Sequence, residues 1–521
     1  MCIRDSYKDV NTIWAGTDDG LIHITRDGGK SWSDITPPQL TPWSKVSIIE
    51  ASHTDAATAY AAINCFRLDD LRAHIYRTRN YGKTWIEITK GLPDNAPVNV
   101  VREDPLRQGL LFAGTETAVY VSFDDGDNWQ PLQLNLPHTS MRDLTIHGDD
   151  LIVATHGRSF WILDDITPLR QLTAAFNTQK DFLFAPQSAI RFRWNRNTDT
   201  PLPPDTPAGQ NPPDGAIIDY YLAPQSAARG PVTLEIFDSQ NHLVRRYSSD
   251  DKPESMEKIA AANPIPMYWV RPEKILSAKP GTHRFVWDLH YTKPDSLSHG
   301  FPISAIYHDT PELPLGAFAL PGNYTVKLRK GNGAPDGYTQ PLTVKMDPRI
   351  KSSGADLAQQ FAMESASVNG MNDTYGALAQ IASVRAQIKD RLAPAGKSPL
   401  ADSLNAFDQL LAQLEGGAES NFAGLPPSGK PPENFSTAHQ HFAGMLGVAD
   451  SYDGAPTTTA IVTFKQLEDD TQQLFAVWKN RKDQELAKLN ADLAKAGQPQ
   501  IDPNKPPTVA PASDDDGDDE P

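Results

Sequence analysis

Acidic, basic and histidine side chains that could do chemistry cluster in four short segments of the first 160 residues. Two carboxyls about 5–9.5 Å apart can hydrolyse a glycosidic bond, one as acid and the other as base or nucleophile. The same side chains, mixed in charge, can instead bind a polar ligand. Eight residues make up this candidate ligand face, namely Asp18, Asp19, Arg67, Asp69, Asp70, Glu116, His156 and Arg158.

These positions also have simpler structural interpretations. Asp18 and Asp19 precede a glycine, a combination typical of a tight turn. His156-Gly157-Arg158 could be a polar site, or a turn whose arginine pairs with Asp164 or Asp165. The residue types alone leave both interpretations open.

The sequence shows no signature of another enzyme class. It has no nucleophile elbow, no phosphate-binding loop and no Cys/His metal cluster. His439 and His441 are two residues apart, which is the wrong spacing for one helix face and disfavours a zinc site. The acidic run 514–520 lacks the spaced ligands of a calcium loop and is predicted to be a solvated tail. We expect no metal and no cofactor.

Composition limits the class of protein. The chain has 521 residues, of which 39% are hydrophobic and 22% charged, as in a soluble globular protein of two or three domains. No apolar run approaches the ~20 residues of a membrane span. The net charge of −17 disfavours a nucleic-acid partner. Two cysteines, Cys2 and Cys65, provide no disulfide framework.

A pattern that occurs three times organises the elements that must position these residues. The segments 25–32, 78–85 and 122–129 all read [Ser/Thr]-x-[Asp/Asn]-x-Gly-x-x-Trp. The short polar side chain can close a turn on the backbone ahead of it, and the glycine accepts a positive φ. Each copy therefore predicts a hairpin tip with a structural role, carried by Asp27, Asn80 and Asp124 in the turns and by Trp32, Trp85 and Trp129 after them.

Strand patterns around these tips repeat as well. The third unit has strands at 98–103, 110–114, 119–123 and 128–132, with the tip between the last two. The second unit matches it, the first is expected to lack its opening strand, and the last has three strands and no tip. This predicts about three and a half blades of a β-propeller within residues 7–170. The eight candidate residues fall on the loops between second and third strands, at one rim.

The repeated pattern resembles the Asp-box, or bacterial neuraminidase repeat. Proteins with this repeat include sialidases, xyloglucanases and sortilin-type receptor domains, and the box acts in them as a structural fastener. The order of the chain resembles large bacterial proteins labelled sortilin-like or glycosyl hydrolase, which carry a propeller, a sandwich and a helical end. The resemblance is supported by His156-Gly157-Arg158-Ser159-Phe160-Trp161-Ile162-Leu163-Asp164-Asp165 and by Arg284-Phe285-Val286-Trp287-Asp288-Leu289. It implies a periplasmic or extracellular location.

The second half of the chain changes its periodicity twice. A connector at 171–215 has a Pro-rich middle, 198–213. Alternating strand patterns at 216–349, with 189–194 as an extra strand, predict an immunoglobulin-like or fibronectin-type sandwich. From 352 to 497 apolar residues recur at helical spacing and predict a small helical bundle. The tail 501–521 is rich in proline and aspartate and is expected to be disordered.

Two hypotheses on function follow from these patterns. In the first, the propeller binds a carbohydrate, peptide or protein and acts as a binding or scaffolding module. In the second, it is the C-terminal part of a glycoside hydrolase, xyloglucanase-like rather than sialidase-like, because a lone Arg158 cannot replace the arginine triad of sialidases. The opening Met1-Cys2-Ile3-Arg4-Asp5-Ser6 is no signal peptide, and the chain is expected to be a fragment. The incomplete ring favours the binding hypothesis.

Overall fold

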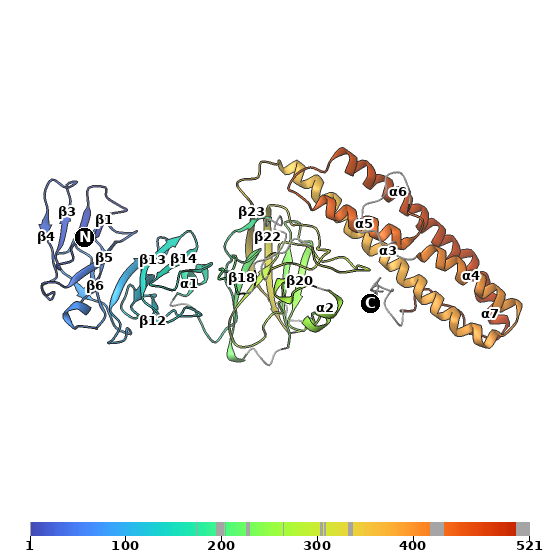
Figure 1. Cartoon of the computed structure of the whole chain (residues 1–521), viewed down its shortest axis with the longest axis horizontal. Helices are drawn as coiled ribbons and strands as arrows, with labels where there is room; N and C mark the ends of the chain where they lie inside the picture. The colour runs from blue at the N-terminus through green and yellow to red at the C-terminus, as the bar shows by residue number, and fades with distance from the viewer. Residues whose placement is uncertain are drawn as a thin grey trace. The chain divides into compact units, whose positions relative to one another are not determined.

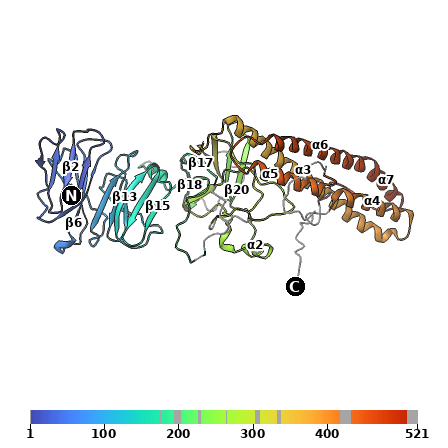
Figure 2. The same ribbon diagram turned by 45° about the horizontal axis from the view of Figure 1, so that its top comes forward.

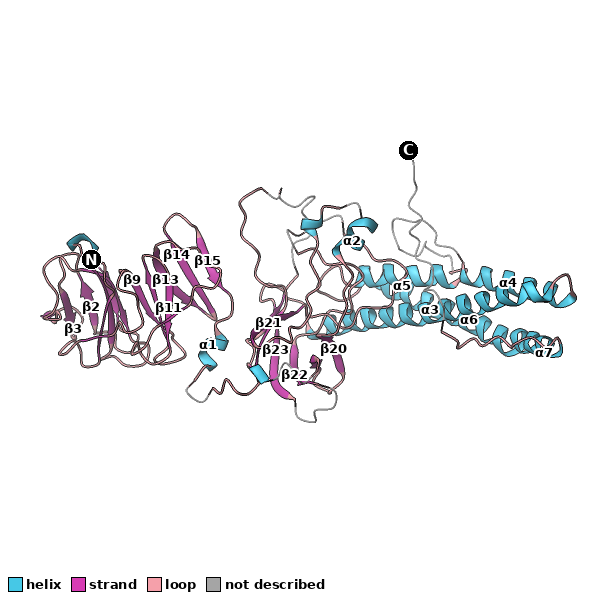
Figure 3. Cartoon of the chain, turned by 90° about the horizontal axis from the view of Figure 1, so that it is seen from below, coloured by secondary structure: helices cyan, strands magenta, loops and turns pink. Residues whose placement is uncertain are grey.

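The computed structural model describes residues 2–173, 176–193, 203, 205–225, 230–263, 265–302, 306, 309–331, 337–416 and 432–506. It divides the chain into two compact units, residues 1–187 and 188–521 (Figure 1). The first unit is built of β-sheets, and the second joins β-sheets to a C-terminal helical region (Figure 3). The expectation of a mainly β protein with a helical end is confirmed, while the domain boundaries drawn from the sequence stay predictions.

Four antiparallel sheets follow one another in the first unit, and each has its strands in chain order. Three sheets have four strands and the last has three, which is the up-and-down order of propeller blades. The strands are β1 (Cys2–Asp5), β2 (Ile13–Gly16), β3 (Ile22–Thr25), β4 (Ser33–Asp34), β5 (Lys45–Ala51), β6 (Ala59–Asn64), β7 (His74–Thr78), β8 (Ile86–Glu87), β9 (Val98–Glu103), β10 (Leu111–Thr115), β11 (Val119–Ser122), β12 (Gln130–Pro131), β13 (Met141–His147), β14 (Asp150–Thr155) and β15 (Phe160–Leu163).

One expectation about these sheets is wrong. The first repeat does have an opening strand, because β1 pairs antiparallel with β2 from Cys2 opposite Gly16 to Asp5 opposite Ile13. This strand is short and half charged, so its sequence shows little of the apolar alternation that predicts a strand. Backbone hydrogen bonds to β2, rather than a pattern of side chains, make this segment a strand. After β15 come a short helix α1 (Thr167–Gln171) and strand β16 (Phe182–Leu183).

A separate hydrophobic core lies between each sheet and the next. In β6, Ala61 and Ile63 belong to the core shared with the first sheet, whereas Tyr60 and Ala62 belong to the core shared with the third. Strand residues alternate between the two faces of a sheet, so a central sheet needs apolar residues at every position. This explains why β6, β7, β10 and β11 are buried along their whole length.

The first strands of all four sheets meet in a row of alternating charges. Glu50 on β5 accepts hydrogen bonds from Arg4 on β1, 2.6 Å away, and from Arg102 on β9, 3.1 Å away. Arg102 also bonds to Asp143 on β13 at 2.7 Å. Side-chain exposure of Glu50 is only 2%. These contacts place β1, β5, β9 and β13 next to one another on the inner side of the four sheets.

The second unit contains two β-sheet layers. One sheet has the strand order β17 (Ala189–Arg191), β23 (Tyr338–Met346), β22 (Gly322–Lys330), β19 (Val232–Phe237) and β20 (Leu243–Ser248), and the other includes β18 (Ala216–Leu222) paired with β21 (Gly281–Trp287). Tyr247 contacts Phe285, and Trp287 contacts Tyr324, at 4.6 and 5.4 Å between ring centroids. Two packed layers are thus shown, and the immunoglobulin-like topology stays a prediction. The predicted strand end at Trp194 lies outside the described residues.

Helices occupy the end of the chain where helical periodicity was predicted. They are α3 (Gly354–Ala395), α4 (Pro399–Glu415), α5 (Phe435–Ala449), α6 (Thr458–Asn480), the π-helical segment η4 (Arg481–Leu486) and α7 (Ala487–Lys495), with α2 (Met256–Ala262) and the 3-10 turn η3 (Met267–Trp269) among the β-strands. Ser353 and Asp356 form a capping box that starts α3. Helix α3 runs along the helical region (Figure 2), and its stripe of Leu378, Ile381 and Val384 is fully buried. In the described part of the chain, no helix combines the length and the apolar character that crossing a membrane requires.

Buried polar contacts join these helices to the β-layers of the same unit. Glu364 of α3 accepts a 2.8 Å hydrogen bond from the backbone of Phe318. Arg191 of β17 forms an ion pair with Asp453, which follows α5. His439 of α5 accepts a hydrogen bond from Leu297 N at 3.2 Å, and burial lowers its pKa to about 4. This histidine is therefore a neutral structural residue.

Candidate functional site

All eight residues of the candidate ligand face lie at the same end of the four sheets. They occupy the connections β2–β3, β6–β7, β10–β11 and β14–β15, which include residues 17–21, 65–73, 116–118 and 156–159 and are called the loop rim from here on. Strands alternate in direction, so the connections into the next sheet, 35–44, 88–97 and 132–140, also reach this end. The three repeat turns, 25–32, 78–85 and 122–129, lie at the opposite end.

The first loop is closed against the connection that follows its own sheet. Trp43 N donates a 2.7 Å hydrogen bond to Asp19 O, and Gly20 has φ +98° with Ser44 O 3.1 Å from the position a Cβ would take. Only glycine fits this approach comfortably. Asp18 and Asp19 are exposed, and Trp43 beside them is 66% exposed with φ 72°. The first loop is thus a tight turn, and an exposed aromatic residue lies beside it.

The second loop fixes one of its two acids and leaves the other exposed. Asp70 accepts hydrogen bonds from Arg72 Nε at 2.9 Å and Nη2 at 2.7 Å, and its Oδ2 lies 3.1 Å from His74 Nε2. The Arg72 guanidinium holds the pKa of Asp70 far below its usual range. Asp69 is exposed and sits at φ 59° at the end of the 3-10 turn η1 (Phe66–Leu68). Asp70 is therefore a loop fastener, and Asp69 is available to a ligand.

Apolar side chains project from the same loop. Phe66, Leu68 and Leu71 are 44%, 41% and 52% exposed, and the guanidinium of Arg67 lies 5.8 Å from the Phe66 ring centroid. Leu134, in the connection between the third and fourth sheets, is 71% exposed. Single exposed apolar residues are ordinary, but several on adjacent loops are a feature of interaction sites.

A row of hydrogen bonds connects the loops of the second, third and fourth sheets. Asn64 Nδ2 donates to Asn99 Oδ1 at 2.9 Å, and Asn99 Nδ2 donates to Glu116 Oε1 at 3.0 Å. Glu116 also pairs with Arg142 at 3.2 Å. Ser140 belongs to the row because its Oγ accepts from Asn99 Nδ2 at 3.3 Å, and its backbone oxygen accepts from His156 N at 2.9 Å, which ties the fourth loop to the row. The structure thus brings the Glu116 side chain and the His156 backbone into one hydrogen-bond network. Several members of this network are partly buried, and this keeps the loops in a fixed arrangement.

The fourth loop is a tight turn. Thr155 Oγ1 accepts from Arg158 N at 3.1 Å and donates to Ser159 O at 2.6 Å. Gly157 and Ser159 both have positive φ, 78° and 63°. His156 and Arg158 are exposed at the tip of this turn. Local hydrogen bonds position the two side chains toward solvent, where a ligand could reach them.

The three repeat turns share one hydrogen-bond pattern. In each, the Asx side chain accepts a 2.9 Å bond from the backbone N–H four residues ahead: Ser31 to Asp27, Thr84 to Asn80 and Asn128 to Asp124. The Ser or Thr two positions earlier accepts a bond from the glycine N–H in all three. Hydrogen bonds from Ser31 lower the pKa of Asp27 to about 2. The polar atoms of these side chains are committed to the turn.

The tryptophans of the second and third turns reach back to the preceding sheet. Trp85 Nε1 donates to Ile35 O at 2.7 Å, and Trp129 Nε1 donates to Ile88 O at 2.8 Å. Both indoles are buried, whereas Trp32 of the first turn is 44% exposed. These contacts fasten one sheet to the next.

Some residues of the loop rim were missed by the sequence reasoning. Trp43 and Leu134 lie within connections between repeats, and Arg142 lies at the start of β13, whereas the repeat pattern points to the loops within a repeat. Asn64 and Asn99 sit at strand ends, and their shared hydrogen bond spans 35 positions. A signal that could have found Trp43 is its position in a Pro- and Ser-containing connection, where a core residue is not expected. Among the described residues, no group of three or more His, Cys, Asp or Glu could hold a metal.

Comparisons with known proteins find resemblance only among solved structures. No protein-family model and no curated protein matches the chain. YCF48 from Cyanidioschyzon merolae is 19% identical, with 32% of this chain and 53% of that chain covered and a TM-score of 0.25. An ancestral GH74 enzyme is 13% identical, with 66% of this chain and 40% of that chain covered and a TM-score of 0.26. The extracellular domain of a hybrid two-component system from B. thetaiotaomicron is 11% identical, with 67% of this chain and 38% of that chain covered and a TM-score of 0.23. The chain spans about half of the first structures it matches, and similarities at these TM-scores do not assign it to a fold family.

Proposed function

We propose that the first unit is part of an Asp-box β-propeller that binds a carbohydrate or protein ligand at its loop rim. The observation that supports this most is the coincidence of exposed Trp43, Phe66 and Leu71 with exposed charged residues at one end of the sheets. Aromatic and apolar side chains provide contact area, and the charged groups orient the ligand. The Asn64–Asn99–Glu116 row beneath them keeps the loops in place before a ligand arrives.

A direct test compares two double variants of equal chemistry. Phe66→Ser with Leu71→Ser removes apolar surface from the loop rim, and Val10→Ser with Leu106→Ser removes exposed apolar surface from the opposite end, where Val10 is 84% and Leu106 72% exposed. Probes are xyloglucan and mixed-linkage β-glucan in affinity electrophoresis, together with an array of unfolded 15-residue peptides. Binding that is lost in the first variant and kept in the second supports the proposal. Equal binding in both variants, or no binding to any probe, would overturn it.

The alternative, part of a glycoside hydrolase, has less support from the geometry. A general acid must be protonated near the working pH. Asp70 cannot serve, because Arg72 keeps its pKa low, and Glu116 is already paired with Arg142 and bonded to Asn99. We therefore expect no hydrolysis of xyloglucan, other β-glucans or sialosides by the purified chain. Turnover that disappears in Asp69→Asn or Glu116→Gln would put the hydrolase first.

The Asp-box resemblance also leads us to propose an exported protein, periplasmic or extracellular. Fractionation of cells that naturally produce the protein tests this directly. Recovery of the chain from the cytoplasm alone would contradict it.

A further inference from the structure

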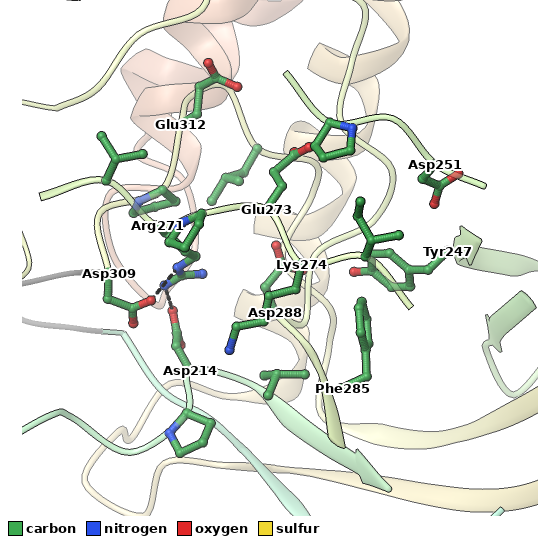
Figure 4. A pocket seen from close by; sticks show the side chains of 18 of the residues that line it. Asp214, Tyr247, Asp251, Arg271, Glu273, Lys274, Phe285, Asp288, Asp309 and Glu312 are labelled. Carbon is green, nitrogen blue, oxygen red and sulfur yellow. Dashed lines mark hydrogen bonds and ion pairs between the residues drawn. The ribbon is translucent and has the colours of Figure 1, made fainter. Parts of the chain in front are cut away.

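The second unit contains a cavity of about 880 Å³ (Figure 4). Its lining comes from strands β20 and β21, from the segments 210–214 and 251–256, and from two irregular segments, 267–275 and 309–315. A volume of this size holds a ligand of several sugar rings or a short peptide. None of the eight loop-rim residues contributes to it.

One wall of the cavity is aromatic. The rings of Tyr247 and Phe285 meet edge to face, with centroids 4.6 Å apart and planes at 61°. Arg245 lies over the Tyr247 ring at 5.2 Å from its centroid. Burial raises the pKa of Tyr247, so its hydroxyl stays a neutral donor. Phe285 is only 4% exposed and backs the Tyr247 ring, so the wall offers a ligand mainly this one ring and its hydroxyl.

The opposite wall is an ion-paired triad. Arg271 bonds to Asp214 at 2.5 Å and to Asp309 at 2.7 Å, and all three side chains are between 21% and 26% exposed. Arg271 lies between the two carboxylates, which share its single positive charge, and all three residues line the cavity (Figure 4). Groups fixed in this way can accept and donate hydrogen bonds without rearrangement.

The side chain of Asp288 lies between these walls (Figure 4). It lines the cavity together with Tyr247 and Arg271. His290 N donates to Asp288 Oδ1 at 3.1 Å, and His290 itself stacks on Phe318. Phe318 is in turn held by Glu364 of α3. The position of Asp288 is therefore set by packing that extends to the helices.

Charge around the cavity is balanced. Six carboxylates and six cationic side chains line it, and Lys293 for example lies 2.8 Å from Glu273. A strongly anionic or cationic ligand would meet as much repulsion as attraction. A neutral ligand rich in hydroxyl groups would find acceptors and donors on one side and an aromatic face on the other.

We propose that this cavity binds a neutral oligosaccharide. An apolar sugar face lies on the Tyr247 ring, one ring hydroxyl donates to Asp288, and further hydroxyls bond to the Arg271 triad. The proposal is independent of the loop rim, since the two sites share no residue.

Binding of defined probes to the full chain tests the proposal. Cellohexaose, xylohexaose and mannohexaose are titrated by calorimetry, with hexagalacturonate and a zwitterionic hexapeptide as charged comparisons. We expect at least one neutral hexasaccharide to bind, and hexagalacturonate and the peptide not to bind. No binding of any neutral probe, or tighter binding of the acidic probe or the peptide, would overturn the proposal.

Variants then locate the bound sugar. Asp288→Asn keeps the oxygen that accepts from His290 N but removes the charge, and it should raise Kd at least about tenfold. Tyr247→Ala should do the same, with its fold checked by circular dichroism. Asp250→Asn, an exposed neighbour outside the lining, should leave Kd unchanged. Phe66→Ser with Leu71→Ser should also leave it unchanged, so failure at the loop rim and failure here are told apart. Equal Kd values for Asp288→Asn and Asp250→Asn would contradict the assignment.

Discussion

At the scale of single residues, Glu50 is a buried charge in the first unit with three charged or titratable partners. Two arginines, Arg4 and Arg102, bond to one of its oxygens, and His53 Nε2 lies 3.3 Å from the other. Burial by itself would raise the pKa of Glu50, but His53 and the two arginines lower it overall. A buried charge with this many partners is costly to leave half broken.

We predict that Glu50→Gln destabilises the first unit by about 3–5 kcal/mol, because it leaves Arg4 and Arg102, which are partly buried, without their buried counter-charge. The folded-state pKa of Glu50 lies below its unfolded value, so this stabilisation is present above pH 4.5 and is lost as pH falls through the lowered pKa. Urea unfolding of the chain at several pH values measures both effects. Glu87→Gln is the control, since Glu87 is 43% exposed and such a pair contributes about 0–1 kcal/mol. Equal losses in the two variants would contradict the prediction.

At the scale of elements, the repeat turns act twice: they close their own hairpin and they fasten their sheet to the preceding one. Asp124 accepts from Asn128 N and Nδ2 within the turn. Trp129 and Gly126 contact Ile88 of the preceding sheet. The two roles can be tested separately.

We predict that Asp124→Ala lowers the stability of the first unit by about 0.5–2 kcal/mol, the scale of losing a capping side-chain bond. Ligand binding at the loop rim should stay unchanged, because the turn lies at the other end of the sheet. Thermal melting and a binding assay on the same variant check this. A variant that melts normally but no longer binds would show that the turn has a direct role in recognition.

A comparison of two glycine positions measures the contact between neighbouring sheets separately from the backbone strain of the turn. Gly126 and Gly29 hold equivalent turn positions with φ of +89° and +92°. A Cβ on Gly126 would lie 2.3 Å from Ile88 Cδ1, whereas one on Gly29 would meet nothing within 4 Å. Both alanine variants lose about 1–2 kcal/mol from the left-handed backbone. We expect Gly126→Ala to lose a further 1–3 kcal/mol, roughly the cost of overpacking, in chemical denaturation. Equal losses would mean that the neighbouring sheet adapts freely.

At the scale of the whole molecule, β-layers and helices of the second unit are expected to unfold together. Arg193, after β17, pairs with Asp450 at 2.6 Å and lies 3.9 Å from Glu364 of α3. Burial, assisted by Asp450, raises the pKa of Glu364 to about 7 despite Arg193 and Arg191. The carboxyl of Glu364, which titrates near neutral pH, thus lies where helix α3 meets the β-layers.

We predict that the carboxyl of Glu364 makes the second unit less stable at pH 8 than at pH 5. The folded pKa of Glu364 is raised, so stability falls as pH rises from about 4.5 to about 7 and is level above that. The Glu364→Gln variant keeps an acceptor for Phe318 N and should lose this dependence, which amounts to about 3 kcal/mol. Unfolding followed by tryptophan fluorescence at both pH values compares the two proteins. An unchanged pH dependence in the variant would exclude Glu364 as its source.

Local features of the first unit were determined by the sequence itself. The turn bonds of Asp27, Asn80 and Asp124 join residues four positions apart, so the pattern carries its own geometry wherever it occurs. The helices were predictable for the same reason, since a 3.6-residue period is written within each segment. Loops that share one position in a repeat could also be placed at one end of the sheets.

Long-range contacts were decided only by the tertiary structure. Strand β1 was missed because its pairing with β2, rather than any pattern of its own, makes it a strand. The bonds of Glu50 to Arg4 and Arg102 span 46 and 52 positions, and no spacing rule connects them. The cavity brings Asp214, Tyr247, Asp288 and Asp309 together from separate segments. Residues so far apart become neighbours only when burial of apolar surface folds the sheets onto each other, so periodicity within a segment cannot reveal them.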